Sequence, residues 1–391
     1  MRLMLFALVA GLSAVITGCD DGTSPVRAEP QQPTEPGSAL FVVGDSLSDT
    51  GNAAAVADYL LGQPLYPEAT IGLCNPGEQL LLDRDCTDIL YGRSRVSDGP
   101  VAVEHLAAHL DVPLEPSFHT VPDRPVVGAN YAVAGAKARG TTPPRDLAHQ
   151  VDRLLLDHGP LLPAGAVVVL MIGGNDAIDA LQAAALPALE DPGDPLRDPN
   201  APPAEPPAGG ADSGAIIAAA IDAVTDAAGR LLDSDACVIA ANVPNLARLP
   251  AVSDTAELEG IDVAAAMTTA AEITTGFNDD LAERLAALAA SHPNGASLVP
   301  FDFNTHFEAA LEAAAAAGSN VTDACFDSET YAGSTTGERN FHAECAPAPG
   351  GAPGFADFFF WDGIHPSGAS HAALGTALID AFETGCPPAA P

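Results

Sequence analysis

The sequence predicts an α/β fold of the three-layer kind, in which a parallel sheet is covered by helices on both faces. Short apolar runs alternate along the chain with longer amphipathic or alanine-rich stretches. The runs are apolar throughout, which is typical of parallel strands that are buried on both faces. The chain has 391 residues, 47% of them hydrophobic, and shows no internal repeat, so we expect one large domain with a substantial core.

The apolar runs are the expected strands, and the stretches between them are the expected helices. The strands are Leu40–Val43, Asn130–Val133, Val167–Ile172, Cys237–Ala241 and Ser297–Phe301. The helices are Asn52–Leu61, Val101–Leu110, Arg145–His158, Ser213–Leu232, Val263–Ser291 and Ser367–Phe382. Residues 186–212 and 319–358 are rich in proline or glycine and are expected to be long loops, either lids that shape a substrate site or decoration.

The N-terminus has the pattern of an export signal. Arg2 precedes an apolar run, Leu3–Thr17, that is shorter than the ~20 residues of a membrane-spanning helix. The run ends in small residues before Cys19, as in bacterial lipoproteins, whose cysteine is lipidated after cleavage; an ordinary signal peptide is the alternative. We expect a signal peptide at 1–18, a lipidated cysteine and flexible linker at 19–37, and a folded domain at 38–391.

The formal net charge of −37 at pH 7 excludes several classes of partner. A chain this acidic is not expected to bind nucleic acid or anionic lipid headgroups. We therefore expect an exported monomer that faces the periplasm or cell exterior and touches the membrane only through its N-terminal lipid. The alanine, glycine and proline content indicates a bias of the source or an adaptation to high salt.

Six cysteines besides Cys19 predict disulfides, because an even number in an exported chain is typical of such bonds. They are Cys74, Cys86, Cys237, Cys325, Cys345 and Cys386. The sequence does not fix their pairing; proximity favours Cys74 with Cys86 and Cys325 with Cys345, which leaves Cys237 for Cys386. A metal site is the alternative, but no C-x-x-C spacing supports it, and we expect no metal.

Residues that follow the strands carry the candidate chemistry, because ligands of open α/β sheets bind beyond the carboxyl ends of the strands. Ser46 follows the first strand, Gly135 the second and Asn175 the third, while Asp362 and His365 follow the aromatic run Phe358–Trp361. A serine is a strong nucleophile only when a base such as histidine takes its proton, and an aspartate can orient that base. Backbone N–H groups beside a glycine, and a side-chain amide, can stabilise an oxyanion.

Each of these residues alone has a simpler interpretation as a turn, cap or packing residue. Asp146 and His149 repeat the D-x-x-H spacing at an expected helix start, where we interpret them as a first-turn charge and a surface residue. His105 and His109 have the spacing of zinc proteases, but Leu106 stands where the glutamate should be, which favours a plain helix face. The order of the pieces, each at a strand end, favours a nucleophilic site at Ser46.

Four segments resemble the conserved blocks of the GDSL, or SGNH, esterase/lipase family. They are GDSLSDTGN, NYAVAGA, IGGND and FWDGIHPSGASH, and their order and spacing match over Ser38–Phe382. The stretch GRSRVSDGPVAVEHLAAHL is also similar to what lies between the first two blocks, and the aromatic-rich last block resembles the lipase-like branch. The resemblance implies a flavodoxin-like sheet of five parallel strands and cleavage of carboxylic esters without a cofactor.

The resemblance also implies a role for each matching residue. Ser46 is the nucleophile, Asp362 and His365 complete a triad, and Ser46, Gly135 and Asn175 form the oxyanion hole. It further supports pairing of Cys325 with Cys345. Ala134 stands where the second block often has glycine, which puts local backbone geometry in question and not the role of Gly135.

The expected function is therefore an exported serine ester hydrolase that acts on a lipid or another small ester. The alternatives are a surface lipoprotein that binds without catalysis and an acyltransferase that uses the same triad. Around the nucleophile, we expect the segment Asp49-Thr50-Gly51-Asn52 to close the loop and cap the next helix.

Overall fold

The structure, a computed structural model, describes most of the chain from Ala39 to Cys386. The described residues are 39–55, 95–121, 126, 128–141, 143–185, 212–327, 340–345 and 354–386. The expected signal peptide, Cys19, the linker, Cys74, Cys86 and the segment 186–211 lie outside these ranges.

The central sheet is parallel, and its strands follow the chain order β1-β2-β3-β4. The strands are β1 (Leu40–Gly44), β2 (Val167–Met171), β3 (Cys237–Ala241) and β4 (Leu298–Phe301). Leu40 pairs with Val167, which pairs with Cys237, so three strands start in register. Every residue of β1, β2 and β3 is buried, as expected for strands covered on both faces.

The five strands implied by the family resemblance are wrong for the described residues, where the main sheet has four. The expected strand Asn130–Val133 runs beside β1 as an irregular segment. Tyr131 N–H donates to Val42 O at 2.7 Å, and Val133 N–H donates to Gly44 O at 3.1 Å. However, the ladder is incomplete, because Gly44 N–H donates to the Gln150 side chain at 2.7 Å, and Ala132 N–H donates to the Asn130 side chain at 2.9 Å.

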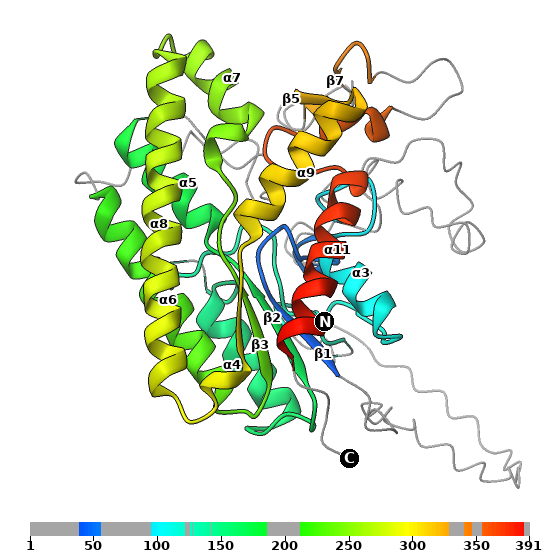
Figure 1. Cartoon of the computed structure of the whole chain (residues 1–391), viewed down its shortest axis with the longest axis vertical. Helices are drawn as coiled ribbons and strands as arrows, with labels where there is room; N and C mark the ends of the chain where they lie inside the picture. The colour runs from blue at the N-terminus through cyan, green and yellow to red at the C-terminus, as the bar shows by residue number, and fades with distance from the viewer. Residues whose placement is uncertain are drawn as a thin grey trace, which may run out of the picture. The chain divides into compact units, whose positions relative to one another are not determined.

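Helices cover both faces of this sheet (Figure 1). On one face α4 (Leu147–His158), α5 (Gly174–Ala184), α6 (Ser213–Leu232) and α8 (Val263–Ser291) pack on one another. On the other face α3 (Ala102–His109) lies along α11 (Gly368–Gly385). The bounds of α6 and α8 are those expected, whereas the expected helix Asn52–Leu61 is described only to residue 55.

The remaining elements were not expected as separate units. They are α7 (Pro250–Leu258), α9 (Phe303–Ala317), β5 (Asn320–Ala324), β6 (Phe326–Asp327), β7 (Asn340–Phe341), β8 (Phe358–Phe360) and the short 3-10 turns Leu246–Arg248, Gly295–Ser297 and Phe355–Asp357. The described part of the segment 319–358 is thus not a plain loop. In it β5 pairs in parallel with β8, and β6 pairs antiparallel with β7.

Aspartates begin four of the longer helices. Asp146, Asp212, Asp262 and Asp302 are the N-cap residues of α4, α6, α8 and α9, and each side chain accepts a backbone N–H of the first turn. Such caps satisfy donors that have no partner within the helix, and the negative charge suits the helix N-terminus. Part of the acidic composition is therefore used to start helices.

Two disulfides join the described elements, with the pairing that was expected. Cys237 at the start of β3 bonds to Cys386, the C-cap of α11, across a sequence separation of 149. Cys325 bonds to Cys345 across a separation of 20. Within the described ranges, no helix is long and apolar enough to cross a membrane.

Removing the long-range disulfide is expected to destabilise the fold more than removing the short one. The double substitution Cys237→Ala/Cys386→Ala should lower the free energy of unfolding by about 2–5 kcal/mol, because the bond closes a long loop in the unfolded chain. Urea denaturation measures this change. Cys325→Ala/Cys345→Ala is the matched control and should lose less, since its separation is 20 and not 149. Equal losses in both would contradict the prediction.

Candidate active site

Segments far apart in the sequence meet beyond the carboxyl ends of β1 and β2. Ser46 lies two residues after β1, Gly135 follows the irregular segment beside β1, and Asn175 lies in the first turn of α5, directly after β2. Asp362 and His365 lie in the turn between β8 and α11. From β1 the chain passes first to the irregular segment Asn130–Val133 on one side of β1 and then to β2 on the other side. Such a reversal of strand order is the switch point where open α/β sheets bind ligands.

The serine, histidine and aspartate form a continuous hydrogen-bonded chain. Ser46 Oγ lies 2.8 Å from His365 Nε2, and His365 Nδ1 lies 2.9 Å from both carboxylate oxygens of Asp362. All three residues are buried, with Ser46 5% exposed. An imidazole in this position can take the proton of the hydroxyl while the carboxylate stabilises the imidazolium that forms.

Asp362 is itself held by the backbone of its own turn. Its Oδ1 accepts the N–H of Ile364 at 2.9 Å and the N–H of His365 at 2.7 Å. The D-x-x-H spacing therefore folds the turn so that the ring and the carboxylate face one another. The opposite ring nitrogen, Nε2, then points at Ser46.

The N–H groups of Ser46, Gly135 and Asn175 are the candidate donors for an oxyanion. Gly135 has a φ of +74°, a conformation that side-chain-bearing residues rarely adopt. Asn175 Nδ2 donates to Ala136 O at 2.9 Å, which fixes the amide and leaves its second N–H available. Among the described residues, neither the Ser46 N–H nor the Gly135 N–H donates to another backbone group. This arrangement can stabilise an oxyanion formed by attack of the serine.

A buried aspartate joins the nucleophile loop to the Gly135 turn. Asp49 accepts the N–H groups of Gly51 and Asn52, both at 2.7 Å, and of Ala53 at 3.0 Å, so it caps the helix as expected. It also accepts the N–H of Ala134 at 2.8 Å, a contact that the sequence analysis missed. Burial raises the pKa of Asp49, and the four N–H donors oppose this. The carboxylate thereby positions the residue directly before Gly135.

Buried amide side chains complete the support around the nucleophile. Asn52 Nδ2 donates to the carbonyls of Asn130 and Ala132, both at 2.8 Å, and Asn130 Nδ2 donates to Ser48 O at 2.7 Å. Gln150 of α4 bonds both the N–H and the carbonyl of Gly44, at 2.7 and 2.8 Å. These amides satisfy backbone groups at an edge where no regular strand does so. Of the three, only Asn130 stands out in the sequence, as a polar residue amid apolar neighbours.

The other motif residues lie elsewhere. Asp146 is the buried N-cap of α4, directly before the first turn where its charge was expected. Its Oδ1 lies 2.7 Å from Nδ1 of His149, whose side chain is about half exposed. His105 of α3 packs against Gly375, and His109 pairs with Glu383 at 3.1 Å. No group of three or more metal-ligating side chains occurs within the described ranges.

Comparison with known families agrees with this geometry. A family model of the GDSL-like lipases and acylhydrolases matches residues 40–378. The chain belongs to this GDSL-like lipase/acylhydrolase family. Membership implies the SGNH α/β hydrolase fold, and the parallel sheet with helices on both faces fits it. A search among curated proteins found no match.

A second buried histidine lies close to His365 in this member of the GDSL-like family. His371 is in the first turn of α11, and its Nδ1 accepts the N–H of Ala102 at 3.3 Å. Burial lowers the pKa of His371 to about 3, with smaller contributions from the nearby imidazoles of His365 and His105. The folded protein therefore keeps this ring neutral at a pH where the unfolded chain protonates it.

Because of His371, stability should fall as the pH drops below 6.5 toward 3. The stability that the neutral His371 ring contributes is fully present above the pKa of the unfolded chain. It is lost as the pH falls, because the unfolded chain takes up a proton that the folded protein does not. Between pH 7 and pH 5, the wild type should lose about 2 kcal/mol more than His371→Gln. Urea denaturation at both pH values measures the difference. Burial also lowers the pKa of His119 to about 3, but His119 is present in both proteins, so its contribution cancels in the difference between them. Parallel losses in the two proteins would refute the assignment.

Proposed function

We propose that this protein is a serine hydrolase that cleaves carboxylic esters through an acyl-enzyme on Ser46. The observation that carries the proposal is the hydrogen-bonded chain from Ser46 through His365 to Asp362. In the proposal Gly135 and Asn175, which follow the two segments beside β1, supply the remaining oxyanion donors. Membership of the GDSL-like lipase/acylhydrolase family supports acyl chemistry at this site.

In the proposed reaction, His365 Nε2 takes the proton of Ser46 as Oγ attacks the acyl carbonyl. The negative charge that develops on the carbonyl oxygen is stabilised by the N–H groups of Ser46, Gly135 and Asn175. His365 then gives its proton to the departing alcohol, and Asp362 stabilises the imidazolium between the two transfers. Water hydrolyses the acyl-enzyme by the same steps, and no cofactor takes part.

We also propose that the chain is exported, that it belongs to the lipase-like branch and that Cys19 carries a lipid. The apolar run that ends at Cys19 supports export and lipidation, and the two disulfides fit an oxidising compartment. In this proposal residues 38–391 are one catalytic domain, a monomer that meets the membrane only through the lipid. The net charge of −37 favours neutral esters over anionic lipid surfaces and argues against nucleic acid.

Replacing the nucleophile tests the reaction directly. Wild type should hydrolyse p-nitrophenyl butyrate, and Ser46→Ala should reduce kcat by at least about 10³-fold, because no other group can form the acyl-enzyme. Release of p-nitrophenol measures the rate. An inert wild type would favour the binding lipoprotein, and product analysis with added alcohol would reveal an acyltransferase.

Removing the side-chain donor of the oxyanion hole should slow turnover without unfolding the protein. Asn175→Ala is expected to lower kcat by roughly 10²–10³-fold, the usual loss for one oxyanion donor. Its melting temperature should stay near that of wild type. Asn294→Ala is the control, because Asn294 Nδ2 makes a comparable bond to Leu232 O at 3.0 Å that lies outside the site. Near-full activity of Asn175→Ala would count against the proposed oxyanion hole.

A further inference from the structure

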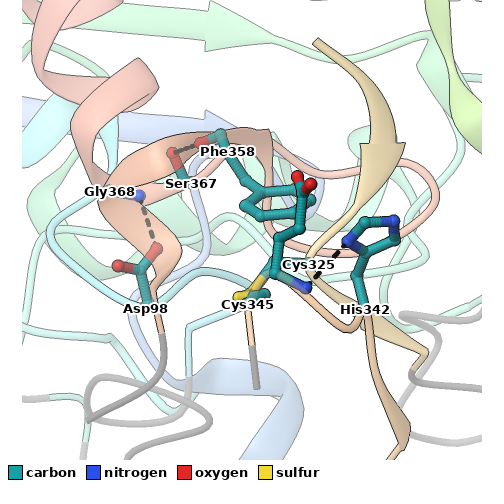
Figure 2. The surroundings of a disulfide bond; sticks show 8 residues. Asp98, Cys325, His342, Cys345, Phe358, Ser367 and Gly368 are labelled. Carbon is teal, nitrogen blue, oxygen red and sulfur yellow. Dashed lines mark hydrogen bonds between the residues drawn. A yellow bond between two sulfur atoms is a disulfide. The ribbon is translucent and has the colours of Figure 1, made fainter. Parts of the chain in front are cut away.

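The turn that carries His365 is held by a second stretch of chain, residues 97–102, which contributes no atom to the triad. Ser97 Oγ donates to Pro366 O at 3.3 Å. The N–H of Gly368 donates to Asp98 Oδ1 at 2.7 Å, as Figure 2 shows. These bonds are made to residues one and three positions after the proposed catalytic base. The segment 97–102 therefore bonds to the residues that directly follow His365 in the chain.

The two backbones touch where Asp98 makes its bond. A Cβ built on Gly368 would lie 2.8 Å from Gly99 Cα, and one built on Gly99 would lie 3.1 Å from Gly368 Cα. No side chain fits at either position without a shift of the backbone. This close approach brings the short side chain of Asp98 within hydrogen-bond distance of the start of α11.

The segment 97–102 is fixed from its own side. Glu104 of α3 accepts the N–H of Val101 at 2.9 Å and pairs with the Arg95 guanidinium through both carboxylate oxygens. Because α3 follows the segment directly and packs along α11, the segment is fixed relative to α11, the helix whose first residue bonds to Asp98.

On the opposite side, the His365 turn is bonded to β8. Trp361 N–H donates to His365 O at 2.8 Å. Ser367 Oγ donates to Phe358 O at 2.8 Å (Figure 2). The chain around His365 is thus bonded both to β8 with the residue that follows it and to residues 97 and 98. The Gly368 N–H belongs to the first helical turn, where no backbone acceptor exists within the helix, so Asp98 supplies its partner.

We propose that Asp98 is a positioning residue for His365, which fixes the start of α11 through the Gly368 N–H and so keeps the imidazole in reach of Ser46. The inference rests on the proposed ester hydrolysis at Ser46. Small displacements of a catalytic group reduce rates severely, by about 10²-fold for ~1 Å. Loss of the Asp98 bond should therefore lower kcat and leave KM unchanged.

An asparagine at position 98 should preserve the positioning of His365, because the hydrogen bond from Gly368 N–H needs only an oxygen acceptor. Burial raises the pKa of Asp98, and the Gly368 N–H opposes this. Asp98→Asn removes the charge and keeps the acceptor, whereas Asp98→Ala removes both. A difference between the two variants therefore isolates the hydrogen bond from the charge.

The experiment compares Asp98→Ala and Asp98→Asn with Asp262→Ala, which removes a similar carboxylate bond, at 3.1 Å to Ala265 N, from the start of α8. For p-nitrophenyl butyrate, Asp98→Ala should lower kcat about tenfold with KM unchanged, while Asp98→Asn stays within about twofold of wild type. The His365 titration midpoint, followed by NMR, should also fall in Asp98→Ala relative to Asp98→Asn, since a looser Asp362 bond stabilises imidazolium less. Asp262→Ala should change neither quantity.

The proposal is overturned if Asp98→Ala matches Asp262→Ala in kcat and in the His365 midpoint, or if Asp98→Asn is as impaired as Asp98→Ala. If wild type does not hydrolyse the ester, the proposed function fails, and the NMR titration, which needs no substrate, still decides the positioning role. Should Asp98→Ala not fold, Ser97→Ala removes the bond to Pro366 O and should lower kcat severalfold; an unchanged kcat there would overturn the proposal.

Discussion

The hydrogen bond between Ser46 Oγ and His365 Nε2 joins residues that are 319 positions apart in the chain. A contact of 2.8 Å between side chains this distant requires two rigid supports. Ser46 is supported by β1, a buried strand paired with β2 over its whole length. His365 is supported by a turn bonded to β8 on one side and to residues 97 and 98 on the other.

Ser46, the proposed nucleophile, follows the strand that has the irregular segment Asn130–Val133 beside it. The irregular segment bonds to β1 through Tyr131 and Val133, while the side chains of Asn52, Asn130 and Asp49 bond other backbone groups of residues 130–134. Buried polar groups are costly when they are unpaired and specific when every partner is present. These bonds therefore fix the backbone up to Ala134, directly before Gly135, whose φ is left-handed.

The sequence predicted the parts of the fold that depend on local pattern. Apolar runs located β1, β2 and β3, and helical periodicity located α6 and α8 with their bounds. Asn130–Val133 was expected as a strand, but its carbonyls at Asn130 and Ala132 bond to the side chain of Asn52, which is 78 and 80 residues away. The bond between Asp98 and Gly368 spans 270 residues, so no spacing along the chain could reveal it. The candidate site residues could be named from the sequence because each follows a strand. Residues that hold them in place, such as Asp49 and Asp98, could not, because their contacts are made to distant segments.

The two D-x-x-H motifs show what local pattern leaves undecided. Asp146 and Asp362 each accept the backbone N–H of the histidine three residues later, at 3.3 and 2.7 Å, and each faces the Nδ1 of that ring, at 2.7 and 2.9 Å. Local geometry is therefore nearly the same in both. The His149 side chain is 48% exposed at the start of α4, whereas His365 is 1% exposed and meets Ser46. Tertiary placement alone turns the second motif into a candidate base, because burial removes competing water and the end of β1 supplies the hydroxyl.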